Sequence, residues 1–394
     1  ETGRKRVLIP VAGQADAALD AMAQAASPRP FAVRDTRAVE RLLGRSMVVS
    51  PTRVEQYYRC RFSYFLQYVL RIRPRRKAEL SPLESGTLVH FILENALRRT
   101  GETFTQLTPD ELRTLASQLA DEYVAQNLPD ASARFAYLIA RLREGVARLL
   151  EFLQAEQRQS SFRPVAFEQT IGEGGEEPLR VVTPEGREVR VIGQIDRVDV
   201  MEREGKRYVR VVDYKTGDKE FRLDDVYCGL NTQMLFYLFT LCRAHEDAVP
   251  AGVLYLAGDP APKAAAREDA GKPSAYRVDG LVLNDPVVIG GMDRAATGLF
   301  VPFTFTAKGA PRASAKLAGL EKLGNIEKHL ESLVVEMARG LYAGDVAATP
   351  LCHGDKSPCA VCDYRAVCRH EDGCGERSVE APDKVFEPKG GDDV

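Results

Sequence analysis

The residues most able to do chemistry lie in two neighbouring segments that alternate apolar and polar residues. Residues 189–200 have the sequence VRVIGQIDRVDV and residues 208–217 the sequence YVRVVDYKTG, a valine-rich alternation typical of β-strands. The polar stretch 203–206 between them contains a glycine and predicts a tight turn that pairs the two strands. With this turn, Asp196 lies directly opposite Asp213, with about 5 Å between the two Cβ atoms.

Two facing carboxylates need a positive charge between them. Like charges opposite each other on a sheet are destabilising, and a divalent metal with oxygen ligands removes the conflict. Lys215 follows Asp213 by two residues and projects from the same face, where it can contact a phosphate or polarise a water molecule. On the opposite face, Asp199 and Arg210 would form an ordinary cross-strand ion pair. The alternative is a surface hairpin decorated with charges, but charges on an otherwise apolar face normally have a function.

These segments resemble a known family. The G-x-x-D-R-x-D stretch at 193–199 and the D-Y-K-T-G stretch at 213–217 are similar to the nuclease domains of the RecB, AddA and AddB proteins, within the PD-(D/E)xK superfamily. Residues 86–94, GTLVHFILE, resemble the family's helix with a metal-ligating histidine, and Q-x-x-x-Y at 233–237 resembles a further motif. The motifs occur in the family's order over roughly residues 48–370.

The resemblance implies an α/β fold with a RecB-like nuclease core, in which a mixed central sheet is flanked by helices. The ligands that it implies for Mg²⁺ or Mn²⁺ are His90, Asp196, Asp213 and the backbone carbonyl of Tyr214. Lys215 would activate the attacking water, while Gln233 and Tyr237 would orient the DNA strand. The residues alone leave alternatives open: a lone histidine on an amphipathic helix is more often a core or surface residue, and Tyr237 could be a packed tyrosine with an incidental Gln233.

A group of cysteines near the C-terminus forms a second candidate site. Cys359, Cys362 and Cys368 follow the turn-forming Ser357-Pro358 in a spacing that suits a metal better than disulfides. The candidates for a fourth ligand are Cys352, Cys374, His353 and His370, which are local, and Cys60, which is distant. A local fourth ligand would complete a tetrahedral zinc site.

The resemblance favours Cys60. AddB-type proteins have a cysteine at this position that combines with three near the C-terminus to hold a 4Fe-4S cluster, and this arrangement would clamp the N- and C-terminal segments together. Thiolates suit both zinc and iron-sulfur clusters, so composition alone does not choose between them. Cys228 and Cys242 lie in apolar surroundings and are expected to be buried bystanders.

Composition limits the remaining possibilities. The 394 residues are 44% hydrophobic, with no apolar run long enough to cross a membrane and no signal-like segment, so we expect a cytoplasmic protein without membrane contact. The net charge of −2 does not by itself indicate nucleic-acid binding, although residues 71–77 carry five cations that could follow a phosphate backbone. The alternative for this run is a solvated loop. A P-loop ATPase motif is absent, so unwinding would have to come from a partner.

The chain divides into three regions. We interpret residues 1–46 as a linker or the remnant of a preceding domain, 47–373 as the nuclease domain with its cysteine cluster, and 374–394 as a polar, disordered tail. Because the sequence begins Glu1-Thr2-Gly3, we expect it to be a fragment of a longer protein. The patterns predict helices over 50–70 and three more between 85 and 157, strands between 163 and 215, a helix over 228–245, a strand over 251–256, strands within 281–306 and a helix over 313–342.

These features together predict a metal-dependent DNA nuclease. The resemblance implies an exonuclease acting on single strands, or at double-strand ends, that an AddA-type helicase-nuclease partner delivers during break repair. The alternative is a non-catalytic module in which the nuclease fold and a zinc site serve DNA binding or assembly. A CRISPR-associated nuclease with the same cysteine pattern is a third interpretation, which the extended N-terminal and helical segments disfavour.

Overall fold

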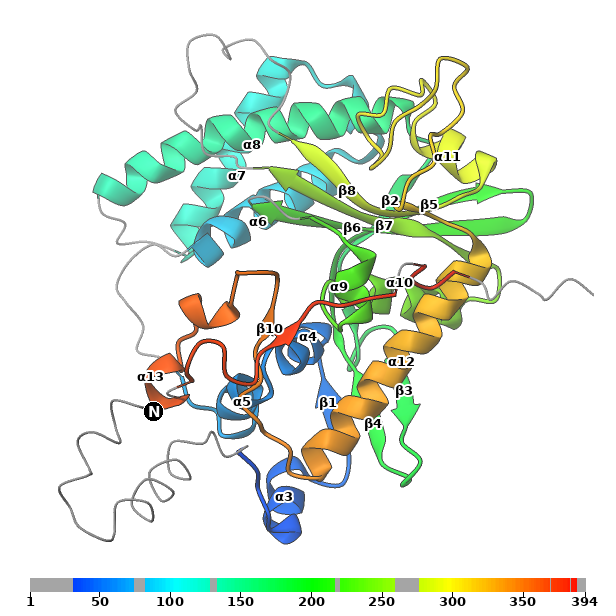
Figure 1. Ribbon diagram of the computed structural model, residues 1–394. Helices are drawn as coiled ribbons and strands as arrows, with labels where there is room; N and C mark the ends of the chain where they lie inside the picture. Colours follow the sequence, from blue (N-terminus) through cyan, green and yellow to red (C-terminus); the bar gives the residue numbers. More distant parts are fainter. Residues whose placement is uncertain are drawn as a thin grey trace, which may run out of the picture.

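A six-stranded mixed sheet contains the two strands that carry the candidate acids (Figure 1). This computed structural model describes residues 31–73, 82–127, 133–216, 220–258, 276–368, 370–382 and 384–387. In spatial order the strands are β2 (Arg163–Ile171), β5 (Gly193–Arg203), β6 (Lys206–Thr216), β7 (Ala248–Gly258), β8 (Arg277–Leu283) and β9 (Leu317–Ala318). The β6–β7 and β8–β9 pairs are parallel and the others antiparallel, which confirms the predicted mixed sheet.

The predicted hairpin is confirmed, and its predicted register is confirmed for the pairs from Arg203–Lys206 to Arg197–Val212. Arg203 pairs with Lys206 across the turn, and Asp199 pairs with Arg210 further along. The two turn residues, Glu204 and Gly205, have φ angles of 54° and 72°. Positive φ at both positions is the geometry of the tight turns whose twist matches that of paired strands. A short local turn therefore sets which residues of β5 and β6 face each other.

Helices cover both sides of the sheet (Figure 1). Helices α7 (Pro109–Asn127) and α8 (Ala133–Gln159) lie on one side, and α4 (Pro51–Arg59), α10 (Gln233–Ala244) and α12 (Leu320–Tyr342) lie on the other. The remaining long helix, α6 (Pro82–Thr100), contacts β5 and β6. The predicted start of α7 is confirmed by reciprocal capping: Thr108 N donates to Glu111 Oε2 at 2.7 Å, and Glu111 N donates to Thr108 Oγ1 at 3.3 Å.

Two predicted elements differ in the structure. The strands expected within 281–306 are wrong beyond Leu283, because Asp285 and Pro286 begin helix α11 (Pro286–Met292) there. The Asp285 side chain accepts from the backbone of Val287 and Val288, and proline suits the first helical position. The helix predicted over 50–70 is interrupted at Cys60, whose extended backbone separates α4 from α5 (Arg61–Tyr64) and the π-helix Phe65–Val69 that follows.

Smaller elements lie beside the central sheet. Strands β1 (Met47–Val49), β4 (Glu188–Val191) and β3 (Leu179–Val182) form a second sheet. Within the segment interpreted as a linker, residues 31–46 include α3 (Thr36–Leu43), and residues 1–30 lie outside the described residues. The basic run is described only at 71–73, and Gly217 of the D-Y-K-T-G motif also lies outside.

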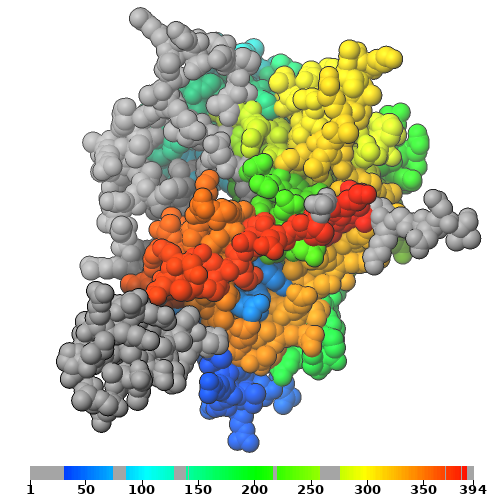
Figure 2. Space-filling model, viewed as in Figure 1, coloured from blue at the N-terminus to red at the C-terminus, as the bar shows by residue number. Residues whose placement is uncertain are grey.

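Part of the predicted disordered tail packs against the body. Strand β11 (Arg377–Ser378) pairs in parallel with β10 (Leu351–Cys352), and Lys322 Nζ lies 2.6 Å from Glu387 Oε1. Figure 2 shows this red segment running across the surface from the orange cysteine-containing region. The prediction of disorder is therefore wrong for this part of the tail, which forms strand pairing and an ion pair with the body. Residues 388–394 lie outside the described residues.

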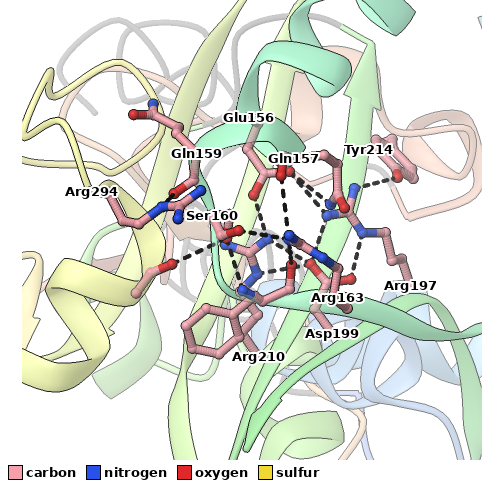
Figure 3. A network of polar contacts seen from close by, with 12 residues as sticks. Glu156, Gln157, Gln159, Ser160, Arg163, Arg197, Asp199, Arg210, Tyr214 and Arg294 are labelled. Atoms are coloured by element: carbon pink, nitrogen blue, oxygen red, sulfur yellow. Dashed lines mark hydrogen bonds and ion pairs between the residues drawn. The ribbon is translucent and has the colours of Figure 1, made fainter. Parts of the chain in front are cut away.

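The face of the hairpin that packs beneath α8 carries a buried ionic network (Figure 3). Arg197 holds Asp199 through two hydrogen bonds of 2.6 Å, and Arg210 Nε donates to the same carboxylate at 2.8 Å. Glu156 of α8 accepts from both arginines, and all four side chains are at most 8% exposed. Burial opposes ionisation of Asp199, but the two guanidinium groups outweigh it and lower its pKa. The expected simple Asp199–Arg210 pair is thus part of a larger buried set.

We predict that Asp199→Ala destabilises the fold by about 3–5 kcal/mol, because it leaves buried guanidinium charge uncompensated. Urea unfolding followed by circular dichroism measures the change. Arg203→Ala, at an exposed position on the same hairpin, is the matched control and should stay within about 0.5 kcal/mol of the parent protein. Equal losses for the two variants would contradict a structural function of the network.

Candidate active site

Helix α6 and the β5–β6 hairpin bring three predicted site residues together. His90 Nδ1 lies 3.3 Å from Asp196 Oδ2, and His90 Nε2 lies 2.9 Å from the backbone oxygen of Tyr214. The backbone N–H of Tyr214 donates to Asp196 Oδ2 at 3.3 Å. An imidazole, a carboxylate and a backbone carbonyl therefore converge on one point, and all three are ligand types that divalent cations use in proteins.

Asp213 lies beside this point in contact with Lys215. The lysine Nζ is 2.9 Å from Asp213 Oδ1 and 2.8 Å from Oδ2, and the Asp213 side chain is only 4% exposed. Burial raises the pKa of Asp213 to about 6; Lys215 opposes the increase, whereas Asp196 adds to it. Burial alone would lower the pKa of Lys215, but Asp213 outweighs burial and the pKa is raised. The ammonium group thus stays charged against a carboxylate that is hard to ionise.

Glu168 is a site residue that sequence reasoning missed. Its strand neighbours Phe167 and Gln169 pair with Arg197 and Ile195, so Glu168 lies opposite Asp196. Ligand atoms of His90, Glu168 and Asp196 all lie within 4.8 Å of one another. Glu168 has a φ of 50°, an unusual backbone conformation for a residue other than glycine and one often found at functional sites.

The pKa of Glu168, like that of Asp213, is raised by burial and by nearby carboxylates. Burial, together with the nearby Asp196 and Glu94 carboxylates, raises the pKa of Glu168 to about 7. A bound cation would stabilise the ionised forms of acids that are both buried and close to other acids. The donor set of His90, Glu168, Asp196 and the Tyr214 carbonyl, with Asp213 beside it, therefore fits a divalent metal.

Gln233 and Tyr237 lie on α10, facing the start of β5. Tyr237 is 5% exposed, and its ring packs so closely on Gly193 that a Cβ at that position would overlap the ring and hydroxyl. Burial raises the pKa of Tyr237 to about 12, while the Gln194 backbone and the Gln233 side chain act in the opposite direction. The first glycine of the G-x-x-D-R-x-D stretch is thus required for the close approach of α10 to β5.

The four cysteines of the predicted distant set line one cavity of about 470 Å³. Cys60 enters it between α4 and α5, and Cys359, Cys362 and Cys368 enter from the short helices Pro358–Val361 and α13 (Arg365–Cys368). His353 and His370 also line the cavity. Burial raises the pKa values of the Cys60, Cys359 and Cys368 thiols, and neighbouring cysteines raise them further.

The other cysteines do not line the cavity, although Cys352 is close enough to Cys359 to raise the pKa of its thiol. Neither Cys352 nor Cys374 is among the residues lining this cavity. The thiol of Cys228 donates to the backbone oxygen of Glu380 at 3.4 Å, and burial raises the pKa of Cys242 to about 12. The structure therefore gathers the cysteine set that includes Cys60 rather than a set built on Cys374.

A sequence profile of the PD-(D/E)XK nuclease superfamily matches residues 48–369. The chain belongs to this superfamily. Its match spans every predicted site residue, from Cys60 to Cys368, and the resemblance of the motifs is confirmed at the level of the family.

Curated relatives share one description, as the B-type subunit of an ATP-dependent helicase/deoxyribonuclease. Those from Clostridium tetani, Clostridium acetobutylicum and Desulforudis audaxviator are 29%, 31% and 32% identical to this chain. The alignments cover 86%, 86% and 85% of this chain but 31%, 31% and 30% of the relatives. The chain thus spans a little under a third of the length of these relatives. Among the described residues, no helix is long and apolar enough to cross a membrane.

We predict that Mn²⁺ stabilises the protein more at about pH 8 than at about pH 5.5. Raised pKa values mean that folding favours the protonated forms of Asp213 and Glu168, so their contribution to stability is present at low pH and is lost as the pH rises through about 6 to 7. A cation binds the ionised forms and restores this loss. Thermal unfolding with Mn²⁺ or with EDTA at both pH values measures the difference. A Mn²⁺-induced shift independent of pH, or one equally pH-dependent in Asp213→Asn, would contradict the prediction.

Proposed function

We propose that this chain is the nuclease domain of a divalent-metal-dependent deoxyribonuclease. The observation that carries the proposal is the convergence of His90, Glu168 and Asp196 beside the Asp213–Lys215 pair, in a chain of the PD-(D/E)XK superfamily. The reaction is hydrolysis of a phosphodiester bond. The names of the relatives, which include deoxyribonuclease, support DNA as the substrate.

The site residues divide the chemistry between them. His90, Asp196, Asp213 and the Tyr214 carbonyl, with Glu168 as an additional acid, would hold Mg²⁺ or Mn²⁺. The metal supplies Lewis acidity and a nucleophile at neutral pH. Lys215, held 2.8–2.9 Å from the Asp213 carboxylate oxygens, positions the attacking water and stabilises negative charge on the phosphate. Gln233 orients the DNA strand from the first turn of α10, with Tyr237 packed behind it.

We also propose that the domain acts within a helicase-nuclease assembly in the cytoplasm. The relatives are named as one subunit of an ATP-dependent helicase/deoxyribonuclease, which supports an AddA-type partner. The sequence lacks a P-loop motif and has a net charge of only −2, so the partner and the rest of a longer chain would unwind and deliver the DNA. The substrate is then single-stranded DNA produced at double-strand ends during break repair, and the domain acts on it as an exonuclease.

The cysteine cavity would hold a 4Fe-4S cluster. Cys60, Cys359, Cys362 and Cys368 all line this cavity, and four cysteine thiolates are the usual ligand set of such a cluster. A metal group would also offset the raised thiol pKa values, because it binds the deprotonated form. Cys60 would then be joined to the C-terminal segment as a structural clamp.

We predict that Asp213→Ala and Lys215→Ala each lower cleavage of single-stranded DNA in Mg²⁺ by at least about 100-fold, because they remove a metal ligand and the group that positions the water. Cleavage of a fluorescent oligonucleotide measures the rate, and fluorescence anisotropy measures binding, which should remain nearly unchanged. Lys328→Ala, an exposed lysine on α12, is the control and should cleave normally. Parent-level cleavage by both site variants would rule out this site, and DNA binding by a parent protein that does not cleave would favour a non-catalytic module.

We predict that Cys60→Ser loses the iron-sulfur chromophore and becomes sensitive to protease, whereas Cys374→Ser retains both properties. Ligation across the long loop between Cys60 and Cys359 restrains the unfolded chain, so its loss loosens the domain. Iron and sulfide analysis under anaerobic conditions, the visible spectrum and limited proteolysis test the pair. Loss of metal from Cys374→Ser but not from Cys60→Ser would instead support a local ligand set, and stoichiometric zinc without iron would support the zinc site.

A further inference from the structure

Helix α10 begins without a capping side chain of its own. Its N-cap residue, Thr232, makes no side-chain hydrogen bond to the first turn. The first N–H groups of a helix have no intrahelical partner, so another acceptor must serve them. Here the acceptor is Glu55 on α4, 177 residues before Thr232. Glu55 Oε1 accepts from the backbone N–H groups of Thr232 at 2.8 Å and Gln233 at 3.1 Å. A carboxylate at this end of a helix is also favoured by the helix dipole.

The loop that leads into α10 is also built against α4. Gly229, with a φ of 82°, lies so close to the Tyr58 ring that a Cβ would overlap it. Asn231 has a φ of 54°, and its side-chain amide donates to Asp225 Oδ2 at 2.8 Å. The contact with Glu55 is therefore part of a closely packed interface between α4 and the loop that leads into α10.

The N-terminal part of α10 lies near the candidate active site, because Asp196 and Asp213 are close enough to Tyr237 to raise its pKa. Gln233 is one of the two residues whose N–H groups Glu55 binds, and Tyr237 packs on Gly193 at the start of β5. Glu55 is also close enough to Lys215 to favour its charged form. One carboxylate of α4 thus faces both the helix that carries Gln233 and the lysine of the site.

We propose that Glu55 is a positioning residue for the nuclease reaction: by capping α10 from α4, it holds Gln233 in the place where it contacts the DNA strand. This inference rests on the proposed nuclease function. Helix α4 would then have two functions, because it presents Glu55 to α10 and also leads directly into Cys60. The same nine-residue helix therefore contacts the start of α10 through Glu55 and ends at Cys60, which lines the cysteine cavity.

The test compares Glu55→Ala with the parent protein, each with its iron content measured. Removing the cap lets the first turn of α10 move, so KM for a single-stranded oligonucleotide should rise about ten-fold while kcat stays within about three-fold. Gln233→Ala should raise KM as much as Glu55→Ala does. The double variant should show no further increase, because both changes remove the same contact between Gln233 and the DNA. Glu55→Gln keeps an acceptor oxygen for the two N–H groups and should remain within about three-fold of the parent KM.

Asp285→Ala is the matched control, because Asp285 caps α11 in the same way, with an oxygen 2.8 Å from the N–H of Val287. It should lower the melting temperature as much as Glu55→Ala does, with KM unchanged. Hydrogen exchange of the peptide covering residues 230–238 reports on the cap without requiring cleavage, and it should be faster in Glu55→Ala alone.

Faster exchange with an unchanged KM would overturn the proposal, because the cap would then be purely structural. It would also be overturned if the KM increases of Glu55→Ala and Gln233→Ala multiplied in the double variant. An equal KM increase in Asp285→Ala, or a Glu55→Gln variant with the same KM as Glu55→Ala, would overturn it as well. Failure of the parent protein to cleave DNA would instead contradict the proposed function. In that case, faster exchange together with weaker oligonucleotide binding in Glu55→Ala would still support positioning of α10.

Discussion

Two carboxylates can face each other across β5 and β6 only while the register of the hairpin is held. The turn at Glu204 and Gly205 sets this register locally, and the buried network on the other face maintains it. A slip of β6 by one residue would turn Arg210 to the other face, away from Asp199 and Glu156. Buried ion networks add little net stability compared with apolar packing, but breaking them is costly. We infer that the network acts mainly against alternative pairings of these two strands.

Tyr214 joins the two faces of the hairpin. Its hydroxyl accepts a hydrogen bond from Arg197 at 3.2 Å within the buried network. Its backbone oxygen contacts His90, and its backbone N–H donates to Asp196. The position of the backbone carbonyl at the site therefore depends on a side chain held on the far side of the sheet. This arrangement explains why the arginine and both aspartates of the G-x-x-D-R-x-D stretch belong to one structural unit, although only Asp196 faces the candidate active site.

Local signals predicted the parts of this structure that depend on neighbours in sequence. The hairpin register follows from a two-residue turn, and the start of α7 follows from the spacing of Thr108 and Glu111. Sequence reasoning missed Glu168 because β2 and β5, although adjacent in the sheet, are separated in the sequence by β3 and β4. No short turn fixes the register of this pair. Asp199 was recognised as paired, but its burial depends on Glu156 from α8. The capping of α10 by Glu55 was equally invisible, because helix caps are read from adjacent residues.

Helix α4 connects features that the sequence presents as separate motifs. Its middle residue, Glu55, accepts hydrogen bonds from the start of α10, and its C-terminal end leads into Cys60 at the cysteine cavity. The tail adds a second connection to the same helix, because Arg377 of β11 donates to the backbone oxygen of Tyr58. Cys60 thus follows, in the same short stretch of chain, both the Tyr58 oxygen that the tail binds and the Glu55 carboxylate that binds the start of α10. One short helix therefore contacts both the cysteine cavity and the helix that carries Gln233.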